Sequence, residues 1–290
     1  MQNNLFDVLT RIASLLERLE MRLPPNPAPI DWQASRAFLW RQKAGRTALH
    51  PIRLPDKIKL EDLHEIEEQK NRITQNTRQF LNRQHANNVL LTGARGTGKS
   101  SLIKALLNAF GDQGLRLVEI EKTDLADLPE LIDLLASRPE RFIIFCDDLS
   151  FEEGEIAYKA LKSVLDGSIA SLPENVLIYA TSNRRHLMPE YQDENLNRQK
   201  IREEIHPGEA IEEKVSLSER FGLWLSFYPM AQDEYLRICR YWLTQFGASE
   251  DLLQNMQTPA LQWSLMRGAR NGRVAWQFAK DFIAQTPISL

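Results

Sequence analysis

Residues 87–107 read NNVLLTGARGTGKSSLIKALL and contain, at 93–100, a full match to the pattern G-x-x-x-x-G-K-[ST]. An apolar strand-like run precedes the match and a helix-like run follows it, as this pattern requires. The glycines allow backbone N–H groups to face inward around phosphates, and the positive end of the helix adds to that field. Lys99 is expected to reach the β- and γ-phosphates and Ser100 to bind Mg²⁺. The sequence therefore predicts a nucleoside triphosphate site formed by Gly93, Ala94, Arg95, Gly96, Thr97, Gly98, Lys99, Ser100 and Ser101.

From Leu60 onward, short apolar runs alternate with helix-like stretches. The expected strands are NVLLTG (88–93), LRLVEI (115–120), FIIFCDD (142–148), NVLIYATS (175–182) and GLWLSF (222–227). Near-continuous apolar strands separated by helices predict a five-stranded parallel sheet covered on both faces, which is a three-layer αβα domain. After Pro229 the helical stretches near 231–246, 251–267 and 272–285 predict a small helical domain. The expected organisation is an N-terminal segment (1–55), an α/β nucleotide-binding domain (56–229) and a C-terminal helical domain (230–290).

The strand-like run FIIFC ends in two adjacent acids within FIIFCDDLSFEE, residues 142–153. A Mg²⁺ ion held by Ser100 and phosphates needs an acidic partner on a neighbouring strand end, and Asp147 is placed to supply it, directly or through water. Asp148 is the candidate to polarise the attacking water, although a helix cap or a salt bridge is the alternative reading. Glu152 and Glu153 are substitutes for it, or open the next helix. Since Asp148 is one methylene shorter than Glu, we expect real but slow hydrolysis.

A third polar position follows the strand NVLIYA. Asn183, in TSNRRHL, is expected beside the acid pair, where its side chain could hold the water against the γ-phosphate. A turn residue is the alternative, because Asn after a strand commonly has that role.

The first 59 residues lie before the alternating pattern. Leu5, Leu9, Ile12, Leu16, Leu19 and Leu23 recur with four-three spacing, which predicts an amphipathic helix that ends at the prolines of 24–29. We expect this face to dock on the chain's own domain; self-association or a partner helix is the alternative. Residues 31–59 are predicted to be irregular, and their basic and aromatic side chains form either a solvated face over an aromatic cluster or a nucleic-acid contact.

Composition limits the function classes. The 290 residues are 43% hydrophobic and 26% charged, as in ordinary globular proteins, and the net charge of -3 does not favour broad nucleic-acid binding. Cys146 and Cys239 lack metal-ligand spacing, which indicates reduced thiols. With no apolar run of eighteen residues and no signal peptide, the expectation is a cytoplasmic protein without membrane association.

The ordered motifs GARGTGKS, FIIFCDD, ATSN, SERFG and a C-terminal Gly-Arg resemble those of AAA+ ATPases. The resemblance is closer to the bacterial AAA-type ATPase family catalogued as domain of unknown function 815. It extends from about residue 35 to the end, through NNVLLTGARGTGKSSLIKALL, FCDDLSFE, IYATSNRRHL, EEKVSLSERFGLWLSF and RNGRVAWQFA.

The resemblance implies that ATP and Mg²⁺ are the ligands and that the C-terminal helices form a lid. It makes Asp147 and Asp148 the Walker B pair and Asn183 the sensor-1 residue. Arg220 matches the arginine presented to a neighbouring subunit's γ-phosphate, and Arg273 matches sensor 2; a surface salt bridge is the alternative for each. Arg267 and Arg270 are substitutes for Arg273, and LEDLHEIE (60–67) resembles the stretch near adenine.

Three functions follow as hypotheses. The leading one is a Mg²⁺-dependent ATPase that assembles as a homo-oligomer, in a ring or filament, with Arg220 acting in trans and hydrolysis coupled to lid movement and partner remodelling. The second is a nucleotide-gated module that recruits an unidentified protein partner with negligible turnover. The third is a loader or remodeller acting on DNA. The charged insert from 186 to 215 is either a loop that orders on assembly or a solvated excursion.

Overall fold

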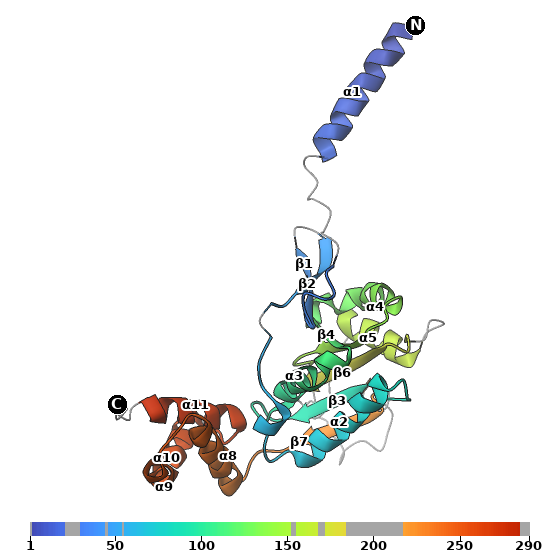
Figure 1. Ribbon diagram of the computed structural model, residues 1–290. Helices are drawn as coiled ribbons and strands as arrows, with labels where there is room; N and C mark the ends of the chain where they lie inside the picture. Colours follow the sequence, from blue (N-terminus) through green and yellow to red (C-terminus); the bar gives the residue numbers. More distant parts are fainter. Residues whose placement is uncertain are drawn as a thin grey trace, which may run out of the picture.

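A computed structural model of the chain describes residues 2–20, 30–43, 46–53, 55–151, 155–167, 172–183 and 217–284 (Figure 1). The charged insert 186–215 and the two acids Glu152 and Glu153 lie outside these ranges. None of the helices within the described ranges combines the length and apolar character needed to cross a bilayer.

The centre of the fold is one sheet with the strand order β2-β1-β4-β5-β6-β3-β7. All neighbouring strands are parallel except β1 and β2. The five strands expected from the sequence are present, as β3 (Val89–Gly93), β4 (Leu115–Ile120), β5 (Arg141–Cys146), β6 (Val176–Ser182) and β7 (Leu223–Phe227). Because these strands are parallel, the residues after β3, β5 and β6 meet at one edge of the sheet.

Two further strands extend the sheet, so the expectation of an irregular segment from 31 to 59 is wrong. Strand β1 (Ala37–Lys43) pairs parallel to β4, and β2 (Arg46–Pro51) pairs antiparallel to β1. Burial of Phe38 and Trp40 on β1 drives this addition, since both side chains are at most 2% exposed. These aromatic rings are part of the core and are not available to stack on nucleic-acid bases.

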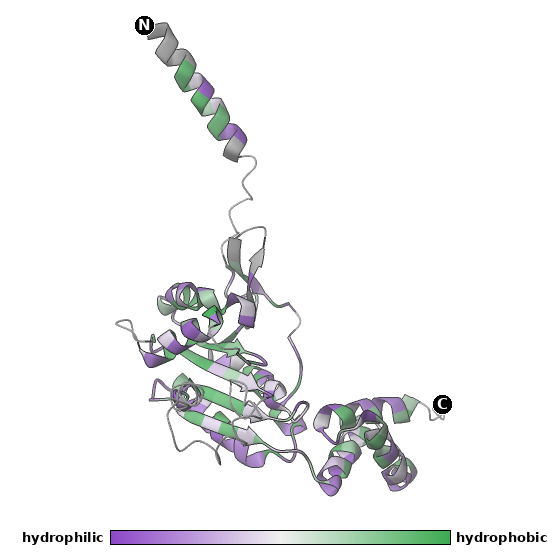
Figure 2. Ribbon diagram, turned by 180° about the vertical axis from the view of Figure 1, so that it is seen from behind, coloured by the Kyte–Doolittle hydropathy of each residue, from purple (hydrophilic) through white to green (hydrophobic). Residues whose placement is uncertain are grey.

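Helices cover both faces of the sheet. One face packs against α2 (Glu67–Leu81) and α3 (Lys99–Phe110), and the other against α4 (Leu128–Ala136) and α5 (Ile156–Asp166). Figure 2 shows apolar strands between these layers. Short 3-10 turns occupy Leu60–Asp62, Gly111–Gln113 and Lys122–Asp127. The three-layer αβα arrangement predicted from the alternating pattern is confirmed.

The C-terminal helices form a separate small core. They are α8 (Gln232–Gln245), α9 (Glu250–Asn255), α10 (Gln257–Arg267) and α11 (Gly272–Ala284). The single helix expected over 251–267 is therefore two helices, which meet at Met256. Tyr235, Cys239 and Phe278 lie in the centre of this core and are at most 2% exposed.

The N-terminal helix α1 (Gln2–Glu20) does not dock through its described side chains. All side chains from 8 to 18 are exposed, and Val8, Leu9, Ile12, Leu15 and Leu16 remain 47–59% exposed. The expected docking on the chain's own domain is thus wrong for these residues. Helices already cover both faces of the sheet, so the core of the α/β domain is complete without α1.

Candidate nucleotide-binding site

The loop predicted to bind phosphates, residues 93–100, is called the phosphate loop; it joins the end of β3 to the start of α3. Gly98 caps α3 with a left-handed φ of 101°, a conformation that glycine adopts without the Cβ penalty of other residues. A Cβ at Gly93 would lie 1.9 Å from the carbonyl oxygen of Phe227 on β7. Glycine at 93 is therefore required by the close approach of the neighbouring strand.

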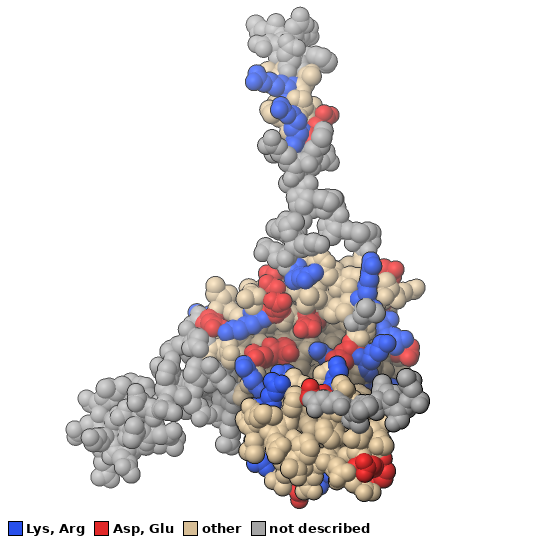
Figure 3. Space-filling view, turned by 90° about the vertical axis from the view of Figure 1, so that its left-hand side faces the viewer, with Lys and Arg blue, Asp and Glu red and all other residues tan. Residues whose placement is uncertain are grey.

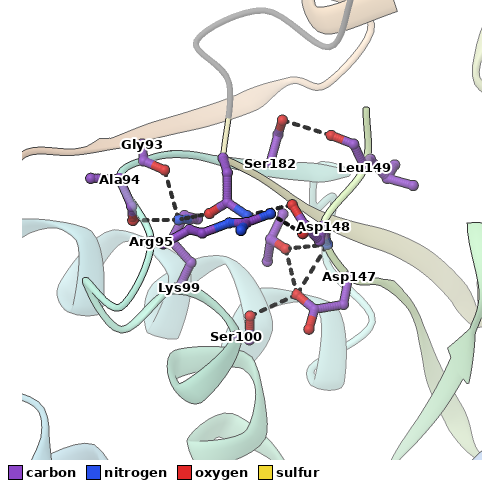
Figure 4. Close-up of polar contacts among 11 residues, drawn as sticks. Gly93, Ala94, Arg95, Lys99, Ser100, Asp147, Asp148, Leu149 and Ser182 are labelled. Carbon is purple, nitrogen blue, oxygen red and sulfur yellow. Dashed lines mark hydrogen bonds and ion pairs between the residues drawn. The ribbon is translucent and has the colours of Figure 1, made fainter. Parts of the chain in front are cut away.

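Lys99 is folded back into the loop. Its Nζ donates hydrogen bonds to the carbonyl oxygens of Gly93 (2.8 Å) and Ala94 (2.7 Å) and to Oδ1 of Asn183 (3.0 Å) (Figure 4). Burial lowers the pKa of Lys99 below its usual range, while the carboxylates of Asp148 and Asp147 act in the opposite direction. A cation that burial destabilises in this way gains from a polyanionic ligand.

Asp147 is the acid that faces the phosphate loop. The hydroxyl of Ser100 donates to Oδ1 of Asp147 at 2.6 Å, so two residues 47 positions apart meet at the end of β5. A hydroxyl and a carboxylate are hard oxygen ligands of the kind that Mg²⁺ prefers. The donor set of these two side chains therefore fits a Mg²⁺ ion.

Thr181 on β6 supports the acid pair, a role that its place one residue before the end of the strand did not reveal. Its hydroxyl donates to Oδ1 of Asp147 at 2.6 Å and accepts from the N–H of Asp148 at 2.9 Å. The carbonyl of Thr181 accepts from the N–H of Leu149 at 2.7 Å. Strand β6 thus fixes the backbone of the two acids as well as one carboxylate.

Asp148 has a left-handed backbone, with φ of 51°. Among residues with a side chain, Asp and Asn adopt this conformation most readily, because their short polar groups bond locally. The local backbone therefore gives a physical reason for aspartate, not glutamate, at this position. One carboxylate oxygen accepts from Nδ2 of Asn183, and the other lies 3.4 Å from the guanidinium of Arg95.

The structure brings Lys99, Asn183 and Asp148 into one chain of contacts. Asn183 accepts from Lys99 through Oδ1 and donates to Asp148 through Nδ2. The Asn183 amide therefore connects the phosphate loop to the second acid. A residue that served only to form a turn would not need these two side-chain contacts. Arg95 was expected only to contact phosphates, and its ion pair with Asp148 had no signal in the sequence.

These residues line a cavity of about 840 Å³ between the α/β domain and the C-terminal helices α8 to α11, for which the name lid is kept below as a label only. Its size lies within the range of small-molecule pockets. Away from the loop, apolar side chains line part of the wall, with Ile58, Leu63 and Ile66 from one segment and Ile238 and Trp242 from α8; the polar side chains of Asp56, Lys57, Asp62 and His64 lie among them. Figure 3 shows acidic and basic side chains gathered around this hollow, beside the lid. A polar end beside an apolar end suits a ligand with phosphates and a flat ring.

Two polar contacts hold α8 against the segment that precedes α2. Arg237 forms hydrogen bonds with both carboxylate oxygens of Glu65, at 2.7 and 2.9 Å. The hydroxyl of Tyr241 donates to Oδ1 of Asp62 at 2.6 Å. The lid is thus joined to the same segment that forms the apolar wall of the cavity.

Comparison with known families shows the family of the chain. The family described as protein of unknown function (DUF815) matches residues 33–286, which is most of the sequence. The chain belongs to this family. No curated protein matches it.

Two solved structures share the fold of this DUF815 chain. A chain in the structure of the E. coli MS115-1 HORMA:CdnC:Trip13 complex is 13% identical with a TM-score of 0.50, over 81% of this chain and 94% of that chain. The replication initiator DnaA bound to AMPPCP and single-stranded DNA is 16% identical with a TM-score of 0.50, over 80% of this chain and 66% of that chain. Together with the sheet order, these likenesses show the P-loop AAA+ fold.

The DUF815 chain places Arg273 at the cavity. Arg273 is the second residue of α11, lines the pocket, and donates its backbone N–H to the carbonyl of Gly96 at 3.4 Å. Arg267 instead stacks over the Trp263 ring at 4.8 Å. Neither Arg267 nor Arg270 lines the pocket, so Arg273 is the lid arginine nearest to the phosphate loop among the three weighed from the sequence.

In this DUF815 chain, Arg220 lies at the N-terminal ends of the parallel strands, whereas the phosphate loop lies at their C-terminal ends. It precedes β7, whereas the phosphate loop follows β3, and β3 and β7 are parallel from Val89↔Leu223 to Gly93↔Phe227. A strand of this length spans about 17 Å. The guanidinium forms an ion pair with Asp166, the last residue of α5. Arg220 therefore does not reach the cavity of its own chain.

Proposed function

We propose that this protein is a Mg²⁺-dependent ATPase. The observation that supports the proposal best is the contact of 2.6 Å between Ser100 and Asp147, in a cavity that also holds Lys99, Asn183 and Asp148. A phosphate-binding lysine, a hard-oxygen pair and a second acid are the parts that phosphoryl transfer to water requires.

In this proposal the apolar end of the cavity binds adenine and the loop binds the phosphates. Lys99 exchanges its contacts with the carbonyls of Gly93 and Ala94 for the β- and γ-phosphates. Ser100 and Asp147 hold Mg²⁺, which supplies neutralisation of the phosphate charge when it is bound. Arg273 reaches the phosphates from the lid.

Asp148 and Asn183 act on the attacking water. The Asp148 carboxylate accepts a proton as the water oxygen bonds to the γ-phosphorus and the bond to ADP breaks, which yields ADP and phosphate. The amide of Asn183 holds the water in line. Because Asp148 is already engaged by Asn183 and Arg95, we expect slow turnover.

Arg220 completes the site of a neighbouring copy in this proposal. Charge builds on the equatorial phosphate oxygens during transfer, and an arginine supplied in trans stabilises it strongly. The position of Arg220, at the edge of the sheet opposite its own phosphate loop, supports action in trans. Assembly into a homo-oligomer, as a ring or filament, then becomes part of the mechanism.

A nucleotide-gated module is the second candidate function. It is favoured by the two contacts that occupy both carboxylate oxygens of Asp148 and by the exposed apolar face of α1, which suits a protein partner. In this candidate ATP stays bound, turnover is negligible, and lid position controls recruitment. Coupling of hydrolysis to lid movement and partner remodelling belongs to the first candidate.

The two candidates differ in the rate of phosphate release measured against protein concentration with ATP and Mg²⁺. A rate per subunit that rises with concentration supports an assembling ATPase. A flat rate near zero, with ATP binding demonstrated by calorimetry, supports the gated module. Absence of any ATP binding would reject both.

Action of Arg220 in trans is tested with mixed subunits. Arg220→Ala and Asp148→Asn chains should each bind ATP and each lack turnover, because one lacks the arginine and the other the base. Mixed assemblies should recover some turnover. At some interfaces the intact pocket of an Arg220→Ala chain meets the intact Arg220 of an Asp148→Asn chain. With co-assembly demonstrated by chromatography, an inactive mixture would contradict action in trans.

A further inference from the structure

The backbone carbonyls of the phosphate loop have two kinds of partner. The oxygens of Gly93 and Ala94 have partners within the loop and α3, because both accept from Lys99 and that of Ala94 also accepts from the Thr97 hydroxyl at 2.8 Å. The next two carbonyls, those of Arg95 and Gly96, accept from the first residues of the lid helix α11 and the residue before it. The lid therefore supplies the partners for half of this run of four carbonyls.

Asn271 makes the side-chain half of this contact. Its Nδ2 donates to the carbonyl oxygen of Arg95 at 3.1 Å, across 176 positions of sequence. Beside it, the N–H of Arg273 donates to the carbonyl of Gly96 at 3.4 Å. A Cβ added at Gly96 would lie 2.6 Å from Cγ of Asn271, so the lid and the loop touch closely at this point.

The direction of these carbonyls matters for phosphate binding. A loop binds phosphates when its N–H groups face the ligand, which requires neighbouring carbonyls to face away. Carbonyls that face away form hydrogen bonds with other protein groups or with water. Asn271 and the backbone of Arg273 are the protein partners at Arg95 and Gly96, on the side of the loop that the lid covers.

We propose that Asn271 is a positioning residue that holds the phosphate loop in its binding shape and couples lid position to phosphate affinity. The coupling acts through the outer carbonyls of the loop, and so is separate from any contact of the Arg273 side chain with the ligand. Because coupling between two equilibria is reciprocal, a bound polyphosphate stabilises the docked lid to the same extent that the docked lid strengthens binding. The reciprocal part rests on the proposed nucleotide-binding function.

A purely structural role must be separated from this one, because Asn271 also begins α11. Its Oδ1 accepts from the N–H of Val274 at 3.0 Å, which is a helix N-cap. Serine caps helices about as well as asparagine but is too short to reach the Arg95 carbonyl. Asn271→Ser therefore keeps the cap and removes the bridge, whereas Asn271→Ala removes both.

The first test is amide hydrogen exchange in peptides from residues 93–98, without nucleotide. Asn271→Ser should raise exchange in these loop residues several-fold and leave the middle of α11 as in the unsubstituted protein. The matched control is Asn255→Ser, since Asn255 is an exposed lid asparagine bonded only within α9. Unchanged loop exchange in Asn271→Ser would overturn the proposal.

The second test is calorimetry with a non-hydrolysable ATP analogue and Mg²⁺. Asn271→Ser should weaken binding about tenfold, the scale of one lost hydrogen bond, while its thermal midpoint stays near that of Asn255→Ser. Loss of affinity in Asn271→Ala alone, with Asn271→Ser unchanged, would reduce the residue to a helix cap. If the unsubstituted chain binds no nucleotide, the proposed function fails, and the exchange experiment still decides whether Asn271 holds the loop.

Discussion

The Thr181 hydroxyl joins the two acids of the site, since it donates to Oδ1 of Asp147 at 2.6 Å and accepts from the N–H of Asp148 at 2.9 Å. Thr181→Val keeps the shape of this buried side chain and removes both bonds. We expect a loss of about 1–3 kcal/mol in unfolding free energy and a higher Mg²⁺ requirement for nucleotide binding. Thr181→Ser should restore both. Denaturant unfolding and Mg²⁺ titration of analogue binding measure the two effects.

The control for this change is Thr92→Val. Thr92 is equally buried on β3, and its hydroxyl accepts from Nε1 of Trp224 instead of contacting the acids. We expect Thr92→Val to lower stability without changing the Mg²⁺ requirement. An equal rise in the Mg²⁺ requirement of both variants would contradict a specific role for Thr181.

Lys99→Ala should abolish ATP binding in calorimetry. The side chain reaches the two carbonyls at the start of the loop, and no other described lysine lines the cavity except Lys57. Lys104→Ala, five residues further along α3 and outside the cavity lining, is the matched control and should bind normally. Unchanged affinity in Lys99→Ala, with the fold intact, would reject the phosphate-loop assignment.

Two substitutions at Asp148 separate the effect of its carboxylate charge on turnover from the effect of its left-handed backbone on stability. Asp148→Asn tolerates the left-handed φ of 51°, so we expect normal folding and ATP binding with loss of turnover. Asp148→Glu lengthens the acid but strains the same backbone, at a cost of about 1 kcal/mol in stability. Phosphate release and thermal unfolding measure the two properties. Full turnover in Asp148→Asn would show that another group activates the water.

The buried thiols predict a loss of stability at alkaline pH. Burial raises the pKa of the Cys146 thiol to about 12 from an ordinary value of 9.0. Below about pH 9 both folded and unfolded chains keep the proton, so the effect is absent. Above that, only the unfolded chain releases it, and the unfolding free energy falls by about 1.4 kcal/mol per pH unit until the pH reaches 12.

Cys146→Ala tests this origin of the alkaline loss. The variant should be less stable at pH 7, because it leaves a small cavity, but should lose less further stability between pH 7 and pH 10. Denaturant midpoints at both values provide the comparison. Parallel falls in the variant and the unsubstituted chain would assign the pH dependence to other groups.

The sequence predicted the parts of the fold that depend on local pattern. The strands β3 to β7 are short apolar runs, and GARGTGKS fixes the loop between β3 and α3, so both were readable from the residues themselves. Strand β1 was missed because Arg41 and Lys43 follow its buried aromatic residues and gave the segment a basic character. What makes it a strand is the exposed side of β4, since the first paired residues, Ala37 and Leu117, lie 80 positions apart in the sequence.

In the candidate site, too, residues in local motifs were predicted from the sequence, whereas residues that act through distant partners were not. Lys99, Ser100 and Asp147 belong to motifs whose spacing states their chemistry. Thr181 and Asn271 act through hydrogen bonds between segments far apart in the chain, and a threonine before a strand end or an asparagine before a helix is common in any protein. Their roles depend on register and on the position of the lid, which no local pattern specifies.

Arg220 and the phosphate loop lie at opposite ends of the parallel strands, and this placement determines how many complete sites an assembly contains. If copies join through these two points, the contact is head-to-tail, and an open row always leaves the pocket at one end without an arginine. A row of two copies then has one complete site, and only a closed ring makes every site complete. Turnover per subunit would therefore increase with the length of an open row, because the one incomplete site becomes a smaller share of all sites. A sharp rise in rate at a defined assembly size would mark ring closure.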